Sequence, residues 1–292
     1  MTRRILIPVR QLTAAAQQVG RGQPLPEIPS TGNDEIAQLT QTFNDMTSRL
    51  AKMETERQRM LADVAHELRT PLTNAQGYLE AIKDGLKKPD PETINSVHRQ
   101  ILQLHRLVDD LRLLTLAESG DLELNLELQP LSEVLSSVVE GFEPRAEAKG
   151  INLPRKYPQD LPVILMDRSR IAQVIGNLMD NAIRYTPEGG SVTVDATCAG
   201  DKVVVTVADT GEGIPSDALP KVFNRLYRHD NSRNRASGGS GLGLSIVEEL
   251  IQAHGGSIGV ESEVGVGSSF YFSLPLRPNL QRRYRKPSSI PV

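Results

Sequence analysis

The chain has 292 residues, enough for two or three small domains, of which 38% are hydrophobic and 24% charged, as in ordinary folded proteins. A net charge of −3 argues against general nucleic-acid binding, and the single cysteine, Cys198, excludes a disulfide or a cysteine-based metal site within one chain. No run approaches the roughly 18 apolar residues that a membrane-spanning helix needs.

The first third of the chain is predicted to be helical. A short helix is expected over 10–19, and the Pro- and Gly-rich connector GRGQPLPEIPSTG separates it from a longer helix that Asn33 or Asp34 can cap. Apolar residues of that longer helix recur at steps of three and four: Ile36, Leu39, Phe43, Met46, Leu50 and Met53. This spacing is the seam of a coiled coil.

Two further apolar stripes follow, separated by the helix-breaking segment GLKKPDPE. The first consists of Leu61, Val64, Leu68, Leu72, Ala75, Leu79, Ile82 and Leu86, and the second of Ile94, Val97, Ile101, Leu104, Val108 and Leu111. Two long amphipathic helices with a short connection form an antiparallel hairpin. One hairpin cannot bury both stripes, whereas two hairpins from two chains make a four-helix bundle. We therefore expect a homodimer.

Beyond residue 121 the pattern mixes strands and helices. Strands are expected over 122–128, 162–166, 257–262 and 268–274, helices over 131–149, 168–185 and 242–253, and a hairpin around Ala199-Gly200-Asp201. The stretch from 211 to 241 is rich in loops. This mixture predicts an α/β layered domain.

His66 lies in the segment VAHELRTPLT, on the first helix of the expected hairpin. It is two residues past the core position Val64, about 200° around the helix, and should therefore point to solvent. Pro71 lacks an N–H, so the carbonyl of Glu67 loses its helical partner and the helix should bend there. A lone histidine in this position is usually only a surface residue.

The segment NLMDNAIRYTP, on the helix expected over 168–185, carries a set of polar side chains. Asn177 and Asn181 are four residues apart and share one helix face. Amide oxygens are neutral Mg²⁺ ligands, suitable where a triphosphate supplies most of the charge. Arg184 offers a cation for phosphate and Tyr185 a ring for a base. By itself the pattern is equally typical of an amphipathic helix with a polar outer side.

Three further segments could approach a nucleotide. Asp209, in ADTGEGI at a strand end, can accept a hydrogen bond from an exocyclic amine, and Gly211 and Gly213 permit a tight turn. GGSGLGLSIV places glycines directly before a helix, where backbone N–H groups and the helix dipole favour an anion. VFNRLYR offers Arg225 and Arg228 for phosphate. Taken alone, each segment is as readily an ordinary turn, a flexible loop or a short helix.

The order of these segments resembles that of sensor histidine kinases. HELRTP, NLxxNAxRYT, DTGxGI, FxRxYR and GSGLGLSIV follow one another as the H, N, G1, F and G2 boxes of that family do. The one mild departure is Leu226, in place of the Phe commonest in the F box. The resemblance covers about residues 1–276 and implies ATP, Mg²⁺ and a nucleotide fold of the gyrase and Hsp90 type, not a P-loop.

The same resemblance implies roles for single residues. His66 would be the nucleophile toward the γ-phosphate of ATP, Glu67 could orient its ring or take its proton, and Thr70 could position a water that hydrolyses a partner's aspartyl phosphate. Asn181 would hold Mg²⁺, and Asp209 would bind the adenine amine. The other residues implied to contact the nucleotide are Asn177, Arg184, Tyr185, Gly211, Gly213, Ile214, Phe223, Arg225, Arg228, Gly239, Gly241, Leu242, Gly243 and Leu244.

The expected fold is multidomain: an all-α, dimeric coiled-coil or four-helix-bundle part, followed by an α/β sandwich. The expected domains are a HAMP-like module over 1–55, a dimerisation and histidine phosphotransfer hairpin over 56–120, an ATP-binding domain over 121–276 and a basic, disordered tail over 277–292. Pro8 is similar to the proline that follows the last transmembrane helix in such sensors. We therefore expect the chain to be the cytoplasmic portion of a protein of the cell membrane.

The implied function is ATP-dependent autophosphorylation of His66, phosphotransfer to an aspartate of a response regulator, and phosphatase activity toward that regulator. One alternative is an ATPase or ATP-driven clamp of the gyrase and Hsp90 type. Those enzymes carry a water-activating Glu four residues before the metal-binding Asn, where this chain has Asn177, which cannot act as a base. A non-catalytic scaffold is disfavoured by the intact boxes, and a serine kinase of the anti-sigma type by the HELRTP helix.

Overall fold

The structure is a computed structural model that describes residues 2–19, 28–29, 35–227 and 241–276. It divides into two compact units, Met1–Arg69 and Thr70–Val292. Among the described residues, no helix is both long enough and apolar enough to cross a membrane.

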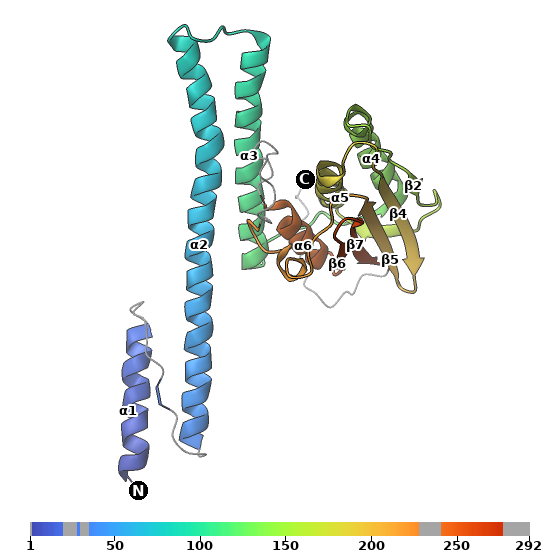
Figure 1. Ribbon diagram of the computed structural model, residues 1–292. Coiled ribbons are helices and arrows are strands. Elements are labelled where there is room, and N and C mark those ends of the chain that lie inside the picture. Colours follow the sequence, from blue (N-terminus) through green and yellow to red (C-terminus); the bar gives the residue numbers. More distant parts are fainter. Residues whose placement is uncertain (1, 20–27, 30–34, 228–240, 277–292) are drawn as a thin grey trace, which may run out of the picture. The chain divides into compact units, whose positions relative to one another are not determined.

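The first unit is helical (Figure 1). Helix α1 spans Thr2–Val19, so it begins before the expected 10–19, and α2 spans Glu35–Lys83 and continues into the second unit. The seam predicted over 36–53 and the one predicted over 61–86 therefore lie on one continuous helix, except for Leu86, which follows the end of α2. The Asn44 side-chain amide accepts from the N–H of Ile28 (3.2 Å) and donates to its carbonyl oxygen (2.9 Å), so Ile28 is fastened to α2.

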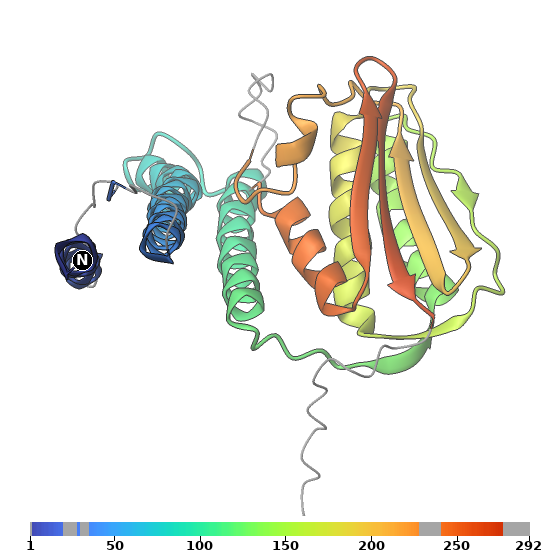
Figure 2. The same ribbon diagram turned by 90° about the horizontal axis from the view of Figure 1, so that it is seen from below.

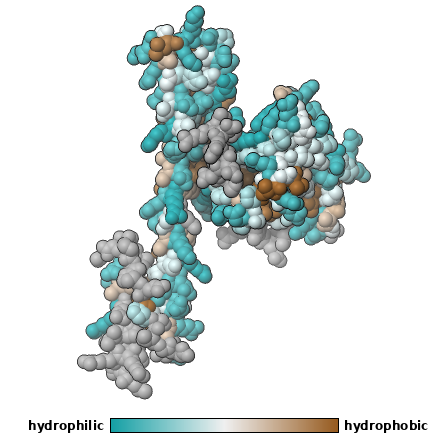
Figure 3. Space-filling model, viewed as in Figure 1, coloured by the Kyte–Doolittle hydropathy of each residue, from teal (hydrophilic) through white to brown (hydrophobic). Residues whose placement is uncertain are grey.

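The second unit opens with the predicted hairpin. Its first arm is the part of α2 that follows residue 69, and its second arm is α3, Pro91–Ser119. Asp90 caps α3 by accepting from the N–H of Thr93 at 2.8 Å, and Pro91 stands in the first turn, where a missing N–H costs nothing. The surface view shows an apolar spot at the turn between the helices, where Leu86 is 80% exposed (Figure 3).

The apolar stripes of the hairpin remain largely uncovered in a single chain. On one side of each helix, large hydrophobic side chains are exposed: Leu72, Leu79, Ile94, Ile101 and Val108. Since exposed apolar stripes of this length are unfavourable in water, they are of the kind that a second chain covers.

The rest of the second unit is an α/β layer. Its elements are β1 (Glu127–Pro130), α4 (Leu131–Ala148), β2 (Arg155–Lys156), β3 (Val163–Met166), α5 (Arg168–Tyr185), β4 (Val192–Ala199), β5 (Lys202–Asp209), a 3₁₀ turn (Leu219–Lys221), α6 (Gly243–Ala253), β6 (Ser257–Glu263) and β7 (Gly267–Pro275). These bounds confirm the expected elements except the strand over 122–128. The pairing there begins only at Glu127, where β1 meets β3 antiparallel.

The main sheet has the order β2-β4-β5-β7-β6, parallel only between β2 and β4. Figure 2 shows α5 (yellow) and α6 (orange) along one face of it. Alternate strand residues, such as Val194, Val205 and Phe272, are buried under these helices, as the two-residue period of a strand requires. The predicted fold class, a helical part followed by an α/β sandwich, is confirmed.

Candidate nucleotide and phosphoacceptor sites

Helix α5 carries the first polar cluster. Asp167 caps it by accepting from the N–H groups of Ser169 (3.0 Å) and Arg170 (3.1 Å), so the start of the helix is fixed. One face of the helix is fully buried, including Ile171, Ile175, Leu178 and Met179. Asn177, Asn181 and Arg184 lie partly buried beside that face, and Tyr185 is 44% exposed at the end.

Asn177 connects α5 to the start of α6. Its Nδ2 donates to the carbonyl oxygen of Gly243 at 3.2 Å, and a Cβ at Gly243 would lie 3.6 Å from the amide carbon of Asn177. On either side of Gly243, the side chain of Leu242 is buried and that of Leu244 is partly buried. The predicted N-box and G2-box segments are therefore neighbours in the structure.

Asp209 ends β5, next to the carboxyl end of α5. Its Oδ1 accepts from the N–H of Gly211 at 2.8 Å and from that of Ser268 at 3.3 Å. Burial raises the pKa of this carboxyl, and the two backbone N–H groups oppose that rise. The carboxylate is thus fixed by two donors while its other oxygen has further acceptor capacity.

The turn after Asp209 has no room for side chains. A Cβ at Gly211 would lie 2.6 Å from the carbonyl oxygen of Tyr185, and Gly213 has φ +75° with the carbonyl oxygen of Glu263 only 2.1 Å from a Cβ position. The next N–H, of Ile214, donates to Ser262 Oγ at 2.8 Å. Glycine is required here because the backbone passes directly over α5 and β6.

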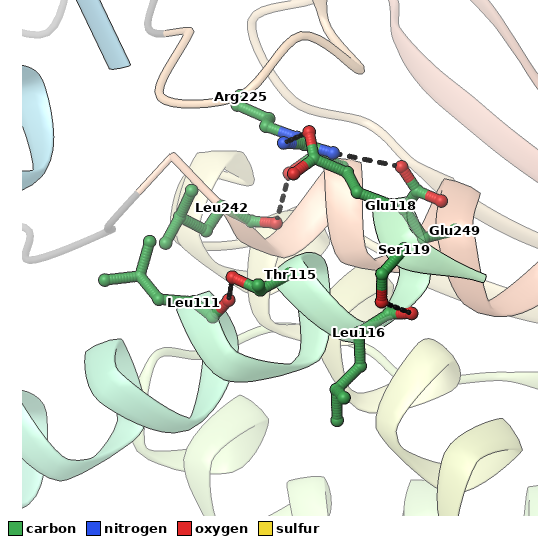
Figure 4. Close-up of polar contacts among 9 residues, drawn as sticks. Leu111, Thr115, Leu116, Glu118, Ser119, Arg225, Leu242 and Glu249 are labelled. Carbon is green, nitrogen blue, oxygen red and sulfur yellow. Dashed lines mark hydrogen bonds and ion pairs between the residues drawn. The ribbon is translucent and has the colours of Figure 1, made fainter. Parts of the chain in front are cut away.

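The F-box segment is held by ion pairs. Arg225 pairs with Glu118 at the end of α3 and, at 3.2 Å, with Glu249 on α6 (Figure 4). Phe223 packs edge-on against Phe270 of β7, with ring centroids 6.4 Å apart. Arg225 therefore links the F-box segment to α3 and α6 through two carboxylates. Its contact with phosphate stays a prediction.

Leu226 and Gly241 bring the two ends of the segment between them together. The N–H of Leu226 donates to the carbonyl oxygen of Gly241 at 3.0 Å, and both residues have positive φ, 58° and 70°. A side chain on Gly241 would lie 2.9 Å from the Leu226 backbone, which accounts for the glycine. Arg228 and Gly239 lie outside the described residues.

His66 lies on α2 and is exposed, as its offset from the core stripe predicts. Glu67 is partly buried, and Thr70 is exposed one helical turn after His66. Pro71 is buried, and the helix assignment continues through it to Lys83. The three residues named for catalysis are therefore neighbours along one helix.

Sequence reasoning missed Ser262 and Ser268. Their hydroxyls share a hydrogen bond at 3.0 Å, and together they hold Ile214 and Asp209 through one bond each. The only signal was the small-residue run GVGSSF, which indicates close backbone approach without naming a partner.

The residues present fit an adenine nucleotide with a divalent cation. A partly buried, oriented carboxylate suits an exocyclic amine, side-chain-free glycines allow close approach, and the Asn181 amide on α5 is an oxygen ligand of the type Mg²⁺ accepts beside phosphate.

Three family models match successive parts of the chain. Residues 1–52 match the HAMP domain, residues 56–120 the His Kinase A (phospho-acceptor) domain, and residues 166–278 the histidine kinase-, DNA gyrase B-, and HSP90-like ATPase. A curated relative, the signal transduction histidine-protein kinase BaeS of Escherichia coli, is 39% identical over 285 residues, or 97% of this chain. The chain spans 60% of the length of that relative.

Solved structures give the same answer. The Acinetobacter baumannii histidine kinase AdeS is 32% identical with a TM-score of 0.62, and the match covers 72% of this chain and 98% of that one. Full-length ShkA in complex with AMPPNP is 32% identical with a TM-score of 0.56, and the match covers 75% of this chain and 46% of that one. Histidine kinase ThkA in complex with response regulator TrrA is 27% identical with a TM-score of 0.59, and the match covers 80% of this chain and 67% of that one. With matching family models along its length and relatives of one kind, this chain belongs to the sensor histidine kinases.

Proposed function

We propose that this chain phosphorylates itself on His66 with ATP and passes the phosphoryl group to an aspartate of a response regulator. One observation carries the proposal: a single chain combines an exposed histidine on a phosphoacceptor helix with a carboxylate, Asp209, fixed at the edge of a glycine-lined turn. The proposed domains are the HAMP-like module over 1–55, the hairpin over 56–120 and the ATP-binding domain over 121–276.

The nucleotide is bound by the second unit. The Asp209 carboxylate accepts from the adenine amine, and the turn through Gly211 and Gly213 lies against the base because no side chain intervenes. Asn181 would hold Mg²⁺ at the triphosphate, and Arg184 would contact phosphate. The ion supplies charge neutralisation on the triphosphate. The AMPPNP complex of ShkA supports a nucleotide of this class.

His66 acts as the nucleophile. A neutral imidazole carries a nitrogen lone pair that can attack phosphorus, and the exposure of His66 makes its ring accessible. A bond forms between a ring nitrogen and the γ-phosphorus, the bond to the bridging oxygen breaks, and ADP leaves. Glu67, the next residue along α2, orients the ring or takes its proton. Thr70 positions a water that attacks the aspartyl phosphate of the regulator, which breaks the acyl–phosphate bond and releases inorganic phosphate.

The partners are a second copy of the chain and a response regulator. The exposed stripes on α2 and α3 support a four-helix bundle between two chains. The ThkA–TrrA complex supports a response regulator as the phosphoryl acceptor. The match of residues 1–52 to HAMP domains supports attachment of the whole protein to the cell membrane.

The decisive experiment replaces His66 by Gln and supplies γ-labelled ATP. We expect the variant to lose all protein labelling, while His98→Gln, an exposed histidine on α3, labels like the parent chain. The label should be lost in acid and kept in base. Labelling that persists in His66→Gln would exclude this assignment, and phosphate release without protein labelling would favour an ATPase instead.

A further inference from the structure

Lys149 makes contacts outside its own helix. It follows α4 as the C-cap residue, and its Nζ donates to the carbonyl oxygens of Ile183 (2.7 Å) and Arg184 (2.8 Å). Both carbonyls belong to the last turn of α5, which ends at Tyr185. A side chain 34 residues away in sequence from Ile183 therefore closes the carboxyl end of α5.

The chemistry of this contact is that of a helix cap. The last carbonyl groups of an α-helix have no partner within the helix and carry its negative end, so an ammonium group there satisfies acceptors and complements the dipole. The carbonyl oxygen of Ala182, one residue before Ile183, accepts from the N–H of Thr186, which follows the helix directly. Lys149 provides the carbonyl oxygens of Ile183 and Arg184 with donors from outside α5.

The residues after Lys149 reinforce the same end of α5. Gly150 accepts at its carbonyl oxygen from the N–H of Gly189 (2.9 Å), and the N–H of Asn152 donates to the carbonyl oxygen of Gly190 (2.9 Å). The turn that leaves α5 is thus fastened to the turn that leaves α4. Two loops distant in sequence form one rigid corner.

This corner adjoins the candidate nucleotide site. The carbonyl oxygen of Tyr185 lies against Gly211, whose N–H in turn orients Asp209. Arg184, whose carbonyl Lys149 binds, is a residue expected to contact phosphate. Partial burial, with the nearby charges of Arg145 and Arg184, lowers the pKa of Lys149. Its ammonium group is therefore held in a positively charged surrounding by the two carbonyl bonds.

We propose that Lys149 is a positioning residue for the nucleotide: it fixes the last turn of α5 so that Arg184 faces the bound phosphates. The inference rests on the proposed function, because it assumes that this site binds ATP. It assigns Lys149 no contact with ATP itself.

The test compares Lys149→Met, Lys149→Arg and the matched control Lys156→Met in the full chain. Lys156 is an exposed lysine on β2, so its replacement removes the same charge without touching α5. Affinities for AMPPNP and for adenosine are measured by calorimetry, and KM and kcat for ATP by His66 labelling. We expect Lys149→Met to raise the Kd of AMPPNP and the KM for ATP about tenfold, the scale of one charge-assisted hydrogen bond.

In that variant the Kd of adenosine and kcat should change much less, because adenosine has no phosphate for Arg184 to contact. Lys149→Arg should recover part of the affinity, and Lys156→Met should match the parent. The inference is overturned if Lys149→Met binds AMPPNP like the parent, or if it loses AMPPNP and adenosine equally along with thermal stability. A parent chain that neither binds AMPPNP nor labels His66 would instead refute the proposed function.

Discussion

The Asn177 side chain donates to the carbonyl oxygen of Gly243 across a distance of 3.2 Å, and this bond joins the middle of α5 to the first residue of α6. The two helices carry different predicted boxes, 66 residues apart in sequence. The bond therefore sets how the glycine-rich start of α6 lies relative to the Asn181 side of α5.

Replacing Asn177 by Ala should weaken nucleotide binding more than it weakens the fold. The carbonyl of Gly243 loses its donor and the start of α6 is less fixed, so we expect a rise of about tenfold in the KM for ATP. Gln173→Ala, one turn earlier on α5, is the control and should leave KM unchanged. An unaltered KM in Asn177→Ala would show that the bond is not needed for binding.

Asp209→Asn should reduce affinity for adenine nucleotides about 100-fold, because the amide replaces a charged acceptor and brings its own donors toward the adenine amine. Affinity for guanine nucleotides should not fall in parallel. Calorimetry with ADP and GDP measures both.

As the pH is lowered, the parent chain should lose affinity for ADP at a higher pH than it would if Asp209 had the pKa of an ordinary Asp. Burial raises the pKa of Asp209, so its carboxylate is protonated at a higher pH than a free one. The loss should be present in the parent and absent in Asp209→Asn. Equal pH profiles for the two proteins would contradict this role.

Glu118→Gln should raise the rate of autophosphorylation a few-fold. Glu118 and Glu249 hold Arg225, which ties the F-box segment to α3 and α6, and removing one carboxylate loosens that tie. The pair is largely exposed on the Glu118 side, so its removal should change the free energy of unfolding by less than about 1 kcal/mol. Glu123→Gln, exposed beyond the end of α3, is the control, and a slower Glu118→Gln would reverse the interpretation.

Asp110→Asn should stabilise the protein at neutral pH. Asp110 lies on the same side of α3 as the buried Leu107 and Leu114. Burial and the neighbouring charge of Asp109 raise its pKa to about 6, against a smaller lowering by Arg106.

The sign follows from proton binding. Between about pH 4 and pH 6 the unfolded chain ionises at this site while the folded one stays protonated, so stability falls as pH rises and remains lower above pH 6. Because water still reaches this half-buried carboxyl, we expect the variant to gain about 1 kcal/mol at pH 7 and nothing below pH 4. Urea unfolding at both pH values measures the difference.

Leu72→Asp combined with Leu79→Asp should convert the proposed dimer into monomers. Both side chains are exposed on α2 within one chain, and a charge placed between two packed helices is strongly unfavourable. Leu128→Asp, at a residue of β1 that is even more exposed, should leave the mass unchanged in light scattering. A parent chain that is monomeric would contradict the proposed bundle.

Much of the local structure could be predicted from the sequence. The α5 bounds, 168–185, follow from the cap at Asp167 and a continuous apolar face, and the β4–β5 hairpin follows from the alternation on either side of Gly200. The strand expected over 122–128 was wrong because alternation alone does not supply a partner, and β3 is too short to pair with it beyond Glu127.

From the sequence alone it can be predicted that His66 is exposed, that Asp209 ends a strand and that glycines are needed in the turn after it. These are local properties, set by helix period, strand period and backbone conformation. The partners of these side chains follow from the three-dimensional fold, which pairs Arg225 with Glu118 and Lys149 with the end of α5. Such contacts join residues distant in sequence, and no local pattern specifies them, because a lysine after one helix gives no indication of which helix end will pack beside it.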